Sequence, residues 1–519
     1  MLREIFSAKH ALLFLASALF VYLFSTSTSQ LYNFLGDDSS IFQAVGKGWA
    51  QGLLPYVDLF ENKGPLIFFF DAIGYMIYPR VGIMFLQVPM TFLSFLFAWR
   101  TLGLFLSGKV KVAAAILSLV HYALYSIDGN RTEEWSMPFL MAATYFFLRG
   151  LKAEKFSCPP IVGFIYGLGF GACTLLRVIN GLPICCYALL SAIFLIQARN
   201  FNALRRNVLN FCAGFAVIVL PFVIYFAAHG ALYDMLYGTI ILNVFYSAQR
   251  ESYLLSHIGY YLSYIVGNFM PLYWLIFISL LKLIKNKSRL AISGLVCGLA
   301  MLLLMFKLSP YFGYCALNTP LLVMLFAMLA VFFEDLRDVW SAKGISLKRM
   351  TCKFFAGLFL VYPIVYGDLL VEKVIEVNSV AFKDYYSQEV CELQRLKEII
   401  PPEERNAVMF WGEGLLASHW ILVTEIYPRC RFFGNTKAFA NIDSNVKREW
   451  LEVARANPPQ WIIYSAPVSE FDGNESDEWI KAFRANRDSD VERLLQEKYS
   501  LADDTELYFA SFRLYRLKK

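Results

Sequence analysis

The feature that most constrains this chain is a series of apolar stretches, each long enough or nearly long enough to cross a lipid bilayer. Only 17% of the residues are charged, whereas roughly 25% is usual in soluble globular domains. We therefore predict a polytopic α-helical membrane protein with about 11 transmembrane helices. The stretches are residues 11–27, 81–99, 112–126, 135–148, 160–176, 182–198, 208–228, 258–281, 290–306, 310–333 and 354–371.

Charge divides the chain into two predicted domains. Residues 1–371 carry 27 Lys and Arg against 16 Asp and Glu, whereas residues 372–519 carry 20 against 25. We expect a multi-spanning membrane domain over 1–371 and a water-soluble domain over 372–519. Short apolar runs alternate with helical stretches in the second part, which predicts a small α/β domain. Its expected strands are 407–412, 430–434 and 461–465, its expected helices lie near 416–427 and 444–456, and a terminal hairpin or strand is expected within 503–517.

The topology depends on one further apolar stretch, residues 65–79. If this stretch lies along the membrane, the inner loops hold 20 basic residues and the outer loops before the tail hold 7. Counting it as a span would instead place 18 basic residues outside. Because inner loops are enriched in Lys and Arg, we predict an interfacial helix at 65–79 within an outer loop, 28–80. The N-terminus is then inside, the first apolar run is an uncleaved anchor, and the C-terminal domain is extracytoplasmic.

The distribution of ionisable residues argues against two functional classes. The formal net charge of +6 could suggest nucleic-acid binding, but the basic residues cluster between apolar runs, where membrane topology explains them. A transporter should show charged groups at mid-membrane, yet His121 is the only ionisable side chain well inside an expected span. The sequence therefore favours an enzyme and gives no support for a nucleic-acid partner.

Candidate chemistry gathers in the outer loop 28–80. Partial burial and nearby like charges can raise the pKa of a carboxyl group enough for general-base catalysis, and the same acids could instead hold a divalent cation. The alternative is that Asp37 or Asp38 simply caps the helix that runs on to Trp49. Spacing alone leaves both interpretations open. The ionisable residues of the loop that lie beside hydrophobic neighbours are Asp37, Asp38, Asp58, Glu61, Lys47 and Lys63.

Two further groups lie in outer loops of the same topology. Glu133 belongs to the short loop 129–138, where the alternative is a helix start capped by Thr132. Arg177 ends its span on the same side, as does the turn at 307–314. A basic residue at such a place can also be a snorkelling anchor, so both interpretations stand.

These motifs, in this order, resemble the GT-C class of glycosyltransferases, which take a sugar from a polyprenyl-phosphate carrier. The similarity is greatest to the bacterial branch that includes Rgt-type lipopolysaccharide core transferases and the aminoarabinose transferase of lipid A; protein O-mannosyltransferases are more distant. It covers residues 1 to about 335. The family often has Asp-Glu where this chain has Asp37-Asp38, so the division of labour within the pair is open. The matching segments are Gly36-Asp37-Asp38, residues 52–58, Asn62-Lys63-Gly64-Pro65-Leu66, Thr132-Glu133, Arg177 and residues 310–314.

The resemblance implies an inverting glycosyltransferase in the bacterial cytoplasmic membrane. Its partners would be a polyprenyl-phosphate-linked sugar donor, a glycan, lipid or protein acceptor, and membrane lipids, with a divalent cation as the one cofactor to consider. The alternatives are a transporter or flippase of lipid-linked sugar and a non-catalytic cell-envelope assembly protein. By resemblance, the site would consist of catalytic Asp37 and Asp38, phosphate-binding Lys63 and Arg177, and Glu133, Glu61 and Tyr311 as residues that position the acceptor or a metal.

Overall fold

The computed structural model describes most of the chain. It describes residues 8–32, 34–126, 129–247, 268–285, 288–307, 312–337, 346, 350–351, 353–355, 357, 380–412, 416–466, 489–506 and 511–519. The chain divides into two compact units. The first unit contains Met1–Leu31, Met84–Tyr225 and Arg250–Glu376, and the second contains Tyr32–Ile83, Phe226–Gln249 and Val377–Lys519.

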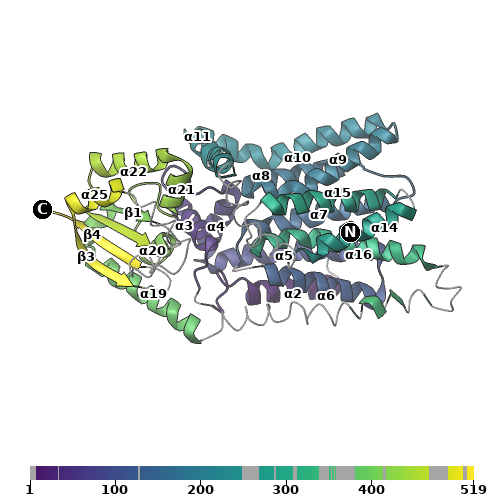
Figure 1. The fold of residues 1–519 in the computed structure, drawn as a ribbon, viewed down its shortest axis with the longest axis horizontal. Helices are drawn as coiled ribbons and strands as arrows, with labels where there is room; N and C mark the ends of the chain where they lie inside the picture. The colour runs from purple at the N-terminus through teal and green to yellow at the C-terminus, as the bar shows by residue number, and fades with distance from the viewer. Residues whose placement is uncertain are drawn as a thin grey trace. The chain divides into compact units, whose positions relative to one another are not determined.

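The first unit is a helical bundle whose long helices run roughly alongside one another (Figure 1). Their apolar side chains form one continuous core, as expected for helices that are apolar on more than one face. The helices of this unit are α2 (Ala8–Phe24), α5 (Val81–Phe105), α6 (Gly108–Tyr125), α7 (Thr132–Lys152), α8 (Pro160–Leu176), α9 (Leu182–Gln197), α10 (Phe201–Ala228), α14 (Met270–Lys285), α15 (Arg289–Lys307) and α16 (Thr319–Asp335), with short turns η1 (Val178–Gly181) and η3 (Phe312–Asn318).

Among the described helical segments, five are long and apolar enough to cross a membrane. The segment Gly313–Asp335 is the most buried of them and Phe201–Ala228 the least, so the first is central in the bundle and the second peripheral. The other three are Val81–Phe105, Val178–Gln197 and Arg289–Phe306, and shorter apolar helices cover Ala8–Phe24, Pro65–Ile77, Pro160–Leu176 and Met270–Ile284. The polytopic membrane fold is therefore confirmed. The count of about 11 spans stays a prediction, because most of 354–371 and part of 258–281 lie outside the described residues.

Small residues bring α8 and α10 into close contact. A Cβ atom added at Gly167 would lie 1.9 Å from the carbonyl oxygen of Phe211, and one at Gly163 would lie 2.3 Å from that of Asn207. The Asn207 amide nitrogen also donates to the carbonyl of Cys158 at 2.7 Å. Backbones that approach this closely, with an amide side chain of α10 bound to the backbone just before α8, are typical of packing between membrane helices.

The second unit contains the predicted outer loop together with the C-terminal part of the chain. Its helix α4 (Pro65–Ile77) confirms the helix expected at 65–79, and its 13 residues extend only about 20 Å against a hydrocarbon core of about 30 Å. The interfacial placement of this helix stays a prediction. The other helices of the unit are α3 (Asp38–Ala50), α11 (Leu232–Leu236), the π-helical turn η2 (Tyr237–Ile241), α19 (Val380–Ile399), η4 (Pro402–Ala407), α20 (Leu416–Thr424), α21 (Thr436–Ile442), α22 (Ser444–Ala456) and α25 (Ser489–Lys498).

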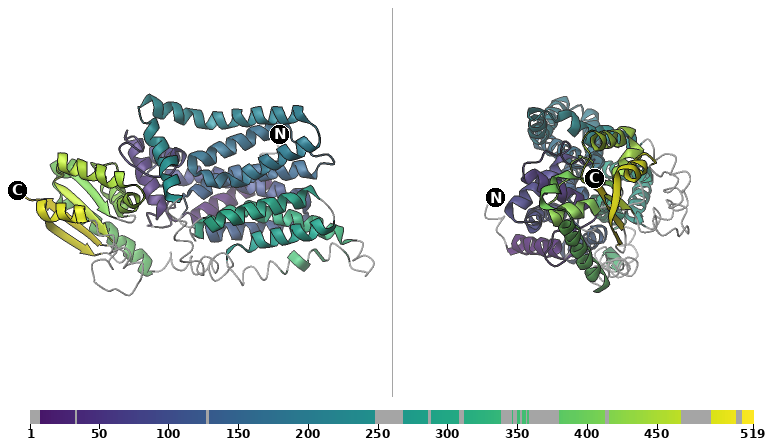
Figure 2. Two further views of the ribbon diagram at one scale, coloured as in Figure 1. Left: turned by 45° about the horizontal axis from the view of Figure 1, so that its top comes forward. Right: turned by 90° about the vertical axis from the view of Figure 1, so that its left-hand side faces the viewer.

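A four-stranded sheet lies in the C-terminal part of the second unit, seen from two further sides in Figure 2. Its strands β1 (Val408–Gly412), β2 (Trp461–Ala466), β3 (Tyr499–Glu506) and β4 (Ser511–Leu517) are arranged in the order β1-β2-β4-β3. The pair β1 and β2 is parallel, and the other two pairs are antiparallel. The sheet confirms the strands expected at 407–412 and 461–465 and the terminal hairpin.

The prediction of a strand at 430–434 was wrong. The backbone hydrogen bond to β1 comes from the residue before this segment, from the Arg429 N–H to the Val408 carbonyl at 2.8 Å, and residues 430–434 form no strand. The next carbonyl, that of Arg431, instead accepts from the Phe60 N–H at 2.9 Å. The apolar run is buried by side-chain contacts with the outer loop rather than by a strand ladder.

Arg431 joins three parts of the second unit. Its guanidinium lies 2.6 Å from Asp234 and 2.7 Å from Glu449, and it donates to the Tyr56 carbonyl at 3.2 Å. The compact unit thus includes loop residues that a division at residue 371 assigns to the membrane domain.

Candidate functional site

The acidic pair stands at the start of α3, where the alternative interpretation of the sequence placed it. Asp37 is exposed and occupies the N-cap position, but its side chain makes no capping hydrogen bond. Its carbonyl instead accepts from the Ser40 N–H at 2.9 Å and from the Ser40 hydroxyl at 2.7 Å. The helix therefore begins without using the Asp37 carboxylate as a cap, although a cap was the alternative for this residue.

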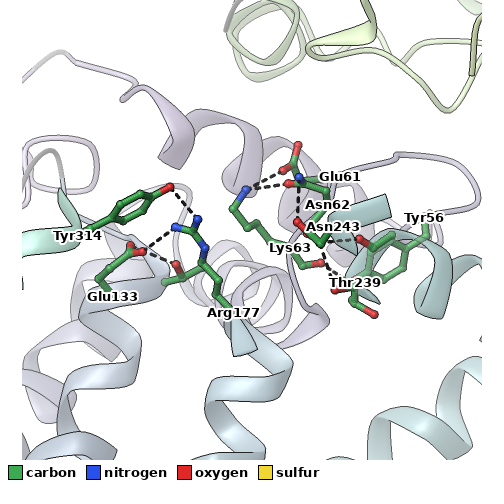
Figure 3. A network of polar contacts seen from close by, with 11 residues as sticks. Tyr56, Glu61, Asn62, Lys63, Glu133, Arg177, Thr239, Asn243 and Tyr314 are labelled. Atoms are coloured by element: carbon green, nitrogen blue, oxygen red, sulfur yellow. Dashed lines mark hydrogen bonds and ion pairs between the residues drawn. The ribbon is translucent and has the colours of Figure 1, made fainter. Parts of the chain in front are cut away.

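Three of the predicted site residues lie together in the second unit, namely Asp38, Glu61 and Lys63. Asp38 is half-buried in the first turn of α3, and Glu61 is only 3% exposed. Lys63 Nζ lies 3.4 Å from Glu61 Oε1 and donates to Asn62 Oδ1 at 2.7 Å, as Figure 3 shows. Burial raises the pKa of Glu61, the Lys63 ammonium lowers it and the Asp38 carboxylate raises it, and the net shift is upward.

The backbone around Lys63 is fixed by residues far away in the sequence. The Tyr56 hydroxyl donates to the Lys63 carbonyl at 2.7 Å, and Tyr56 itself has a left-handed φ of 69°. The Asn243 amide nitrogen donates to the Asn62 carbonyl at 2.8 Å (Figure 3). The Lys63 side chain remains 20% exposed, so its ammonium is held in place and still accessible to an anionic ligand.

Arg177 is the predicted phosphate-binding cation that lies in the first unit. It follows the last residue of α8, and its Nη1 lies 3.2 Å from Glu133 Oε1 while its Nη2 donates to the Tyr314 hydroxyl at 2.7 Å (Figure 3). The guanidinium carbon also lies 4.3 Å from the centroid of the Tyr314 ring. A snorkelling anchor would not need three such contacts, so Arg177 is a positioned guanidinium with part of its side chain, 19%, exposed.

Glu133 lies in the first turn of α7, where the alternative was a helix start capped by Thr132. The helix does begin at Thr132, but its N-cap residue is Arg131 and that side chain makes no capping bond. The Thr132 hydroxyl instead donates to Glu133 Oε2 at 3.1 Å. Glu133 therefore has one oxygen bound by Thr132 and the other by Arg177.

The structure groups most of the predicted residues but not all. It brings Asp38, Glu61 and Lys63 together in the second unit, and Glu133 and Arg177 together in the first. Tyr311 lies outside the described residues, whereas Tyr314 of the same turn contacts Arg177. Sequence reasoning missed the role of Asn243, which has no local motif.

The described residues contain no set of side chains that could bind a metal ion together. No group of three or more His, Cys, Asp or Glu side chains there could hold a metal ion. The divalent cation considered in the sequence analysis stays a prediction.

The chain is similar to known proteins only at the level of structure. No family model and no curated protein matches it. Its fold is similar to that of ArnT from Cupriavidus metallidurans bound to undecaprenyl phosphate, with a TM-score of 0.56 and 12% identity, over 98% of this chain and 98% of that one. The apo state of the same ArnT gives a TM-score of 0.56 at 12% identity, over 97% of each chain.

A second similar structure comes from an archaeon. The Archaeoglobus fulgidus oligosaccharyltransferase tethered with an acceptor peptide matches with a TM-score of 0.52 and 14% identity, over 99% of this chain and 74% of that chain. Identities this low establish the fold and leave the activity to be argued from the site. The chain therefore has a fold similar to that of ArnT and of the archaeal oligosaccharyltransferase, which agrees with the resemblance of its loop motifs.

Proposed function

We propose that this protein is an inverting glycosyltransferase that moves a sugar from a polyprenyl-phosphate carrier to an acceptor hydroxyl at the outer face of the bacterial cytoplasmic membrane. The observation that carries the proposal is the fold likeness along the whole chain to ArnT, a protein solved with undecaprenyl phosphate bound. The archaeal oligosaccharyltransferase supports the acceptor side, because it was solved with a tethered acceptor peptide.

In the proposed reaction, Asp37 is the general base. Asp37 is exposed at the start of α3, so an acceptor hydroxyl can reach its carboxylate, which takes the proton of that hydroxyl. The acceptor oxygen then forms a bond to the anomeric carbon as the bond from that carbon to the phosphate oxygen breaks. The electron pair leaves with the polyprenyl phosphate, and the configuration at the sugar is inverted.

The leaving phosphate gains negative charge in this step, so fixed cations stabilise the transition state. We assign this role to Lys63 and Arg177. Each is held by a carboxylate and by a second polar partner, and each keeps about a fifth of its side chain exposed. Such cations are already oriented before the substrate binds, which lowers the reorganisation needed during the reaction.

The remaining acids would orient the acceptor or the cations. Glu133 binds Arg177 directly, and Glu61 contacts Lys63 beside Asp38. We assign Asp38 to support of the base, and Tyr311 stays a proposed acceptor contact on the strength of the resemblance. A transporter or flippase of lipid-linked sugar, or an assembly protein, would need none of these residues for chemistry.

The test is Asp37→Asn in purified protein reconstituted into vesicles. The vesicles contain glycolipid extracted from cells that lack the protein, as acceptor, and undecaprenyl-phosphate-linked sugars as donors. Mass spectrometry measures release of undecaprenyl phosphate and gain of sugar by the acceptor. Loss of a general base should slow transfer about 10² to 10⁴-fold.

Asp58→Asn is the matched control. Asp58 lies in the same loop, is exposed, and accepts a hydrogen bond from the Leu54 N–H at 2.6 Å, which an asparagine oxygen can still accept. This variant should transfer at nearly the wild-type rate. Retained transfer by Asp37→Asn, or no transfer by the wild type with any donor, would refute the proposal.

A further inference from the structure

A buried histidine of the C-terminal segment contacts the backbone just before the acidic pair. His419 on α20 is 4% exposed, and its Nε2 lies 2.9 Å from the carbonyl oxygen of Gly36. Its Nδ1 lies 2.7 Å from Oε1 of Glu389, a fully buried residue of α19. All three residues belong to the second unit.

The two partners of His419 determine where its protons are. A carbonyl oxygen can only accept, so Nε2 must carry a hydrogen. An ionised Glu389 also accepts, which requires a hydrogen on Nδ1 and makes His419 an imidazolium. Burial alone would lower the pKa of His419, but the Glu389 carboxylate, the Gly36 carbonyl and the Asp37 charge together raise it.

A second contact from the same helix fixes the next carbonyl. The Ser40 hydroxyl donates to the carbonyl of Asp37 at 2.7 Å, and its oxygen lies 2.6 Å from the hydroxyl oxygen of Ser418. Because Ser40 has one hydroxyl hydrogen, Ser418 is the donor between the two serines. The carbonyls of Gly36 and Asp37 are thus both held from α20, one directly and one through Ser40.

These two carbonyls belong to the peptide planes on either side of the Asp37 Cα atom. A peptide unit is planar, so fixing each carbonyl fixes the plane and sets φ and ψ at Asp37. The chain enters this point through Gly36 at a φ of 89°, where residues with a side chain are strained. The direction in which the Asp37 side chain leaves the backbone follows from the φ and ψ angles at this residue.

We propose that His419, backed by Glu389, is a positioning residue that holds the Gly36–Asp37 peptide in the conformation needed for Asp37 to act as a base. This inference rests on the proposed function and deepens it. It gives the C-terminal segment a defined part in catalysis without substrate contact.

Three variants in the full-length reconstituted protein test the inference. The double variant His419→Leu with Glu389→Leu removes the pair without leaving one buried charge unpaired, which would itself be destabilising. His419→Gln keeps a side-chain donor for the Gly36 carbonyl. Glu425→Gln is the control. It removes the ion pair of 2.9 Å between the mostly exposed Glu425 and Lys47, and Lys47 lies in the last turn of α3, at the opposite end from Asp37.

The double variant should lose about tenfold or more in kcat. The loss could reach roughly 10²-fold, because a misplacement of about 1 Å can cause an effect of that size. KM for the undecaprenyl-phosphate sugar should change little. His419→Gln should restore most of kcat, and Glu425→Gln should match the wild type. Hydrogen–deuterium exchange should show faster uptake at amides 36–40 in the double variant alone.

The outcomes separate the two claims. An unchanged kcat or unchanged exchange at 36–40 in the double variant would refute the positioning role while the proposed function stands. A parallel rise in KM, or no recovery with glutamine, would assign the loss to general disruption and would also refute it. No transfer by the wild type would refute the proposed function, and the inference with it.

Discussion

At the scale of one residue, the contacts of Arg177 suit the phosphate-binding role proposed for it. A guanidinium presents its donors in a rigid planar fork, and here separate nitrogens serve Glu133 and the Tyr314 hydroxyl. A lysine at this position would keep the charge but could not reproduce that fork.

Replacement of Arg177 by Lys should therefore reduce kcat/KM for the polyprenyl-phosphate donor. Loss of a hydrogen bond to a charged group costs about 1.5–3 kcal/mol, which corresponds to roughly ten- to hundredfold in rate. Steady-state kinetics in vesicles measures the change. Arg395→Lys is the matched control, because Arg395 also binds two carboxylates, those of Glu392 and Asp503; equal effects of both changes would refute a special role for Arg177.

The positions of the proposed site residues were predictable where a local motif contains them, whereas their roles stay proposals. Asp37, Asp38, Glu133 and Arg177 stand at helix ends that the apolar pattern locates. Whether an acid at a helix start is a cap was not predictable, since the alternatives share one spacing and differ only in the direction of a side chain. His419 had no signal at all, because its partner Gly36 is 383 residues away.

At the scale of elements, the packing of α3 on α4 supports the acidic pair. A Cβ atom added at Gly46 of α3 would lie 2.3 Å from the Cβ of Asp71 and 3.0 Å from the backbone nitrogen of Ala72, both on α4. Backbone atoms cannot move aside as a flexible side chain can, so the two helices depend on this glycine.

Gly46→Ala should therefore separate the two helices and destabilise the second unit. Overpacking in a close contact costs about 1–3 kcal/mol. Thermal unfolding in detergent should show a lower Tm and the vesicle assay a lower transfer rate. Gly434→Ala is the control, because nothing lies within 4 Å of a Cβ at that position; a Tm for Gly46→Ala equal to that of the control would contradict this packing argument.

Element prediction worked best where a single continuous apolar run forms the whole element. The stretch expected at 160–176 coincides with α8, and the strand expected at 461–465 is β2 with one more residue. The expectation at 430–434 failed because an apolar run has the composition of a strand, while its hydrogen-bond partners depend on distant residues such as Phe60.

At the scale of the whole molecule, the proposed topology places the sheet-containing segment outside the membrane. A cysteine at position 501, where Leu501 is 52% exposed, should react with an impermeant maleimide in intact spheroplasts of a Cys391→Ser background. A cysteine at the exposed position 155, in a predicted inner loop, should react only after permeabilisation. Labelling at 501 that requires permeabilisation would overturn the orientation and the outer-face reaction.

The grouping of the outer loop with the C-terminal segment could not be predicted from the sequence. Charge and apolar pattern divide the chain near residue 371, whereas the compact unit includes Tyr32–Ile83. Contacts such as that of Arg431 with the Tyr56 carbonyl join segments 375 residues apart, and neither composition nor periodicity contains that information.

The central claim is that the protein transfers sugar from a polyprenyl-phosphate carrier with Asp37 as the base. Its most direct test is mass spectrometry of glycolipids, surface polysaccharides, glycoproteins and polyprenyl-phosphate sugars in a deletion strain complemented with wild type or with Asp37→Asn. The account predicts that one glycan lacks a sugar and that the corresponding polyprenyl-phosphate sugar accumulates, with the wild type alone restoring both. Full restoration by Asp37→Asn would contradict it.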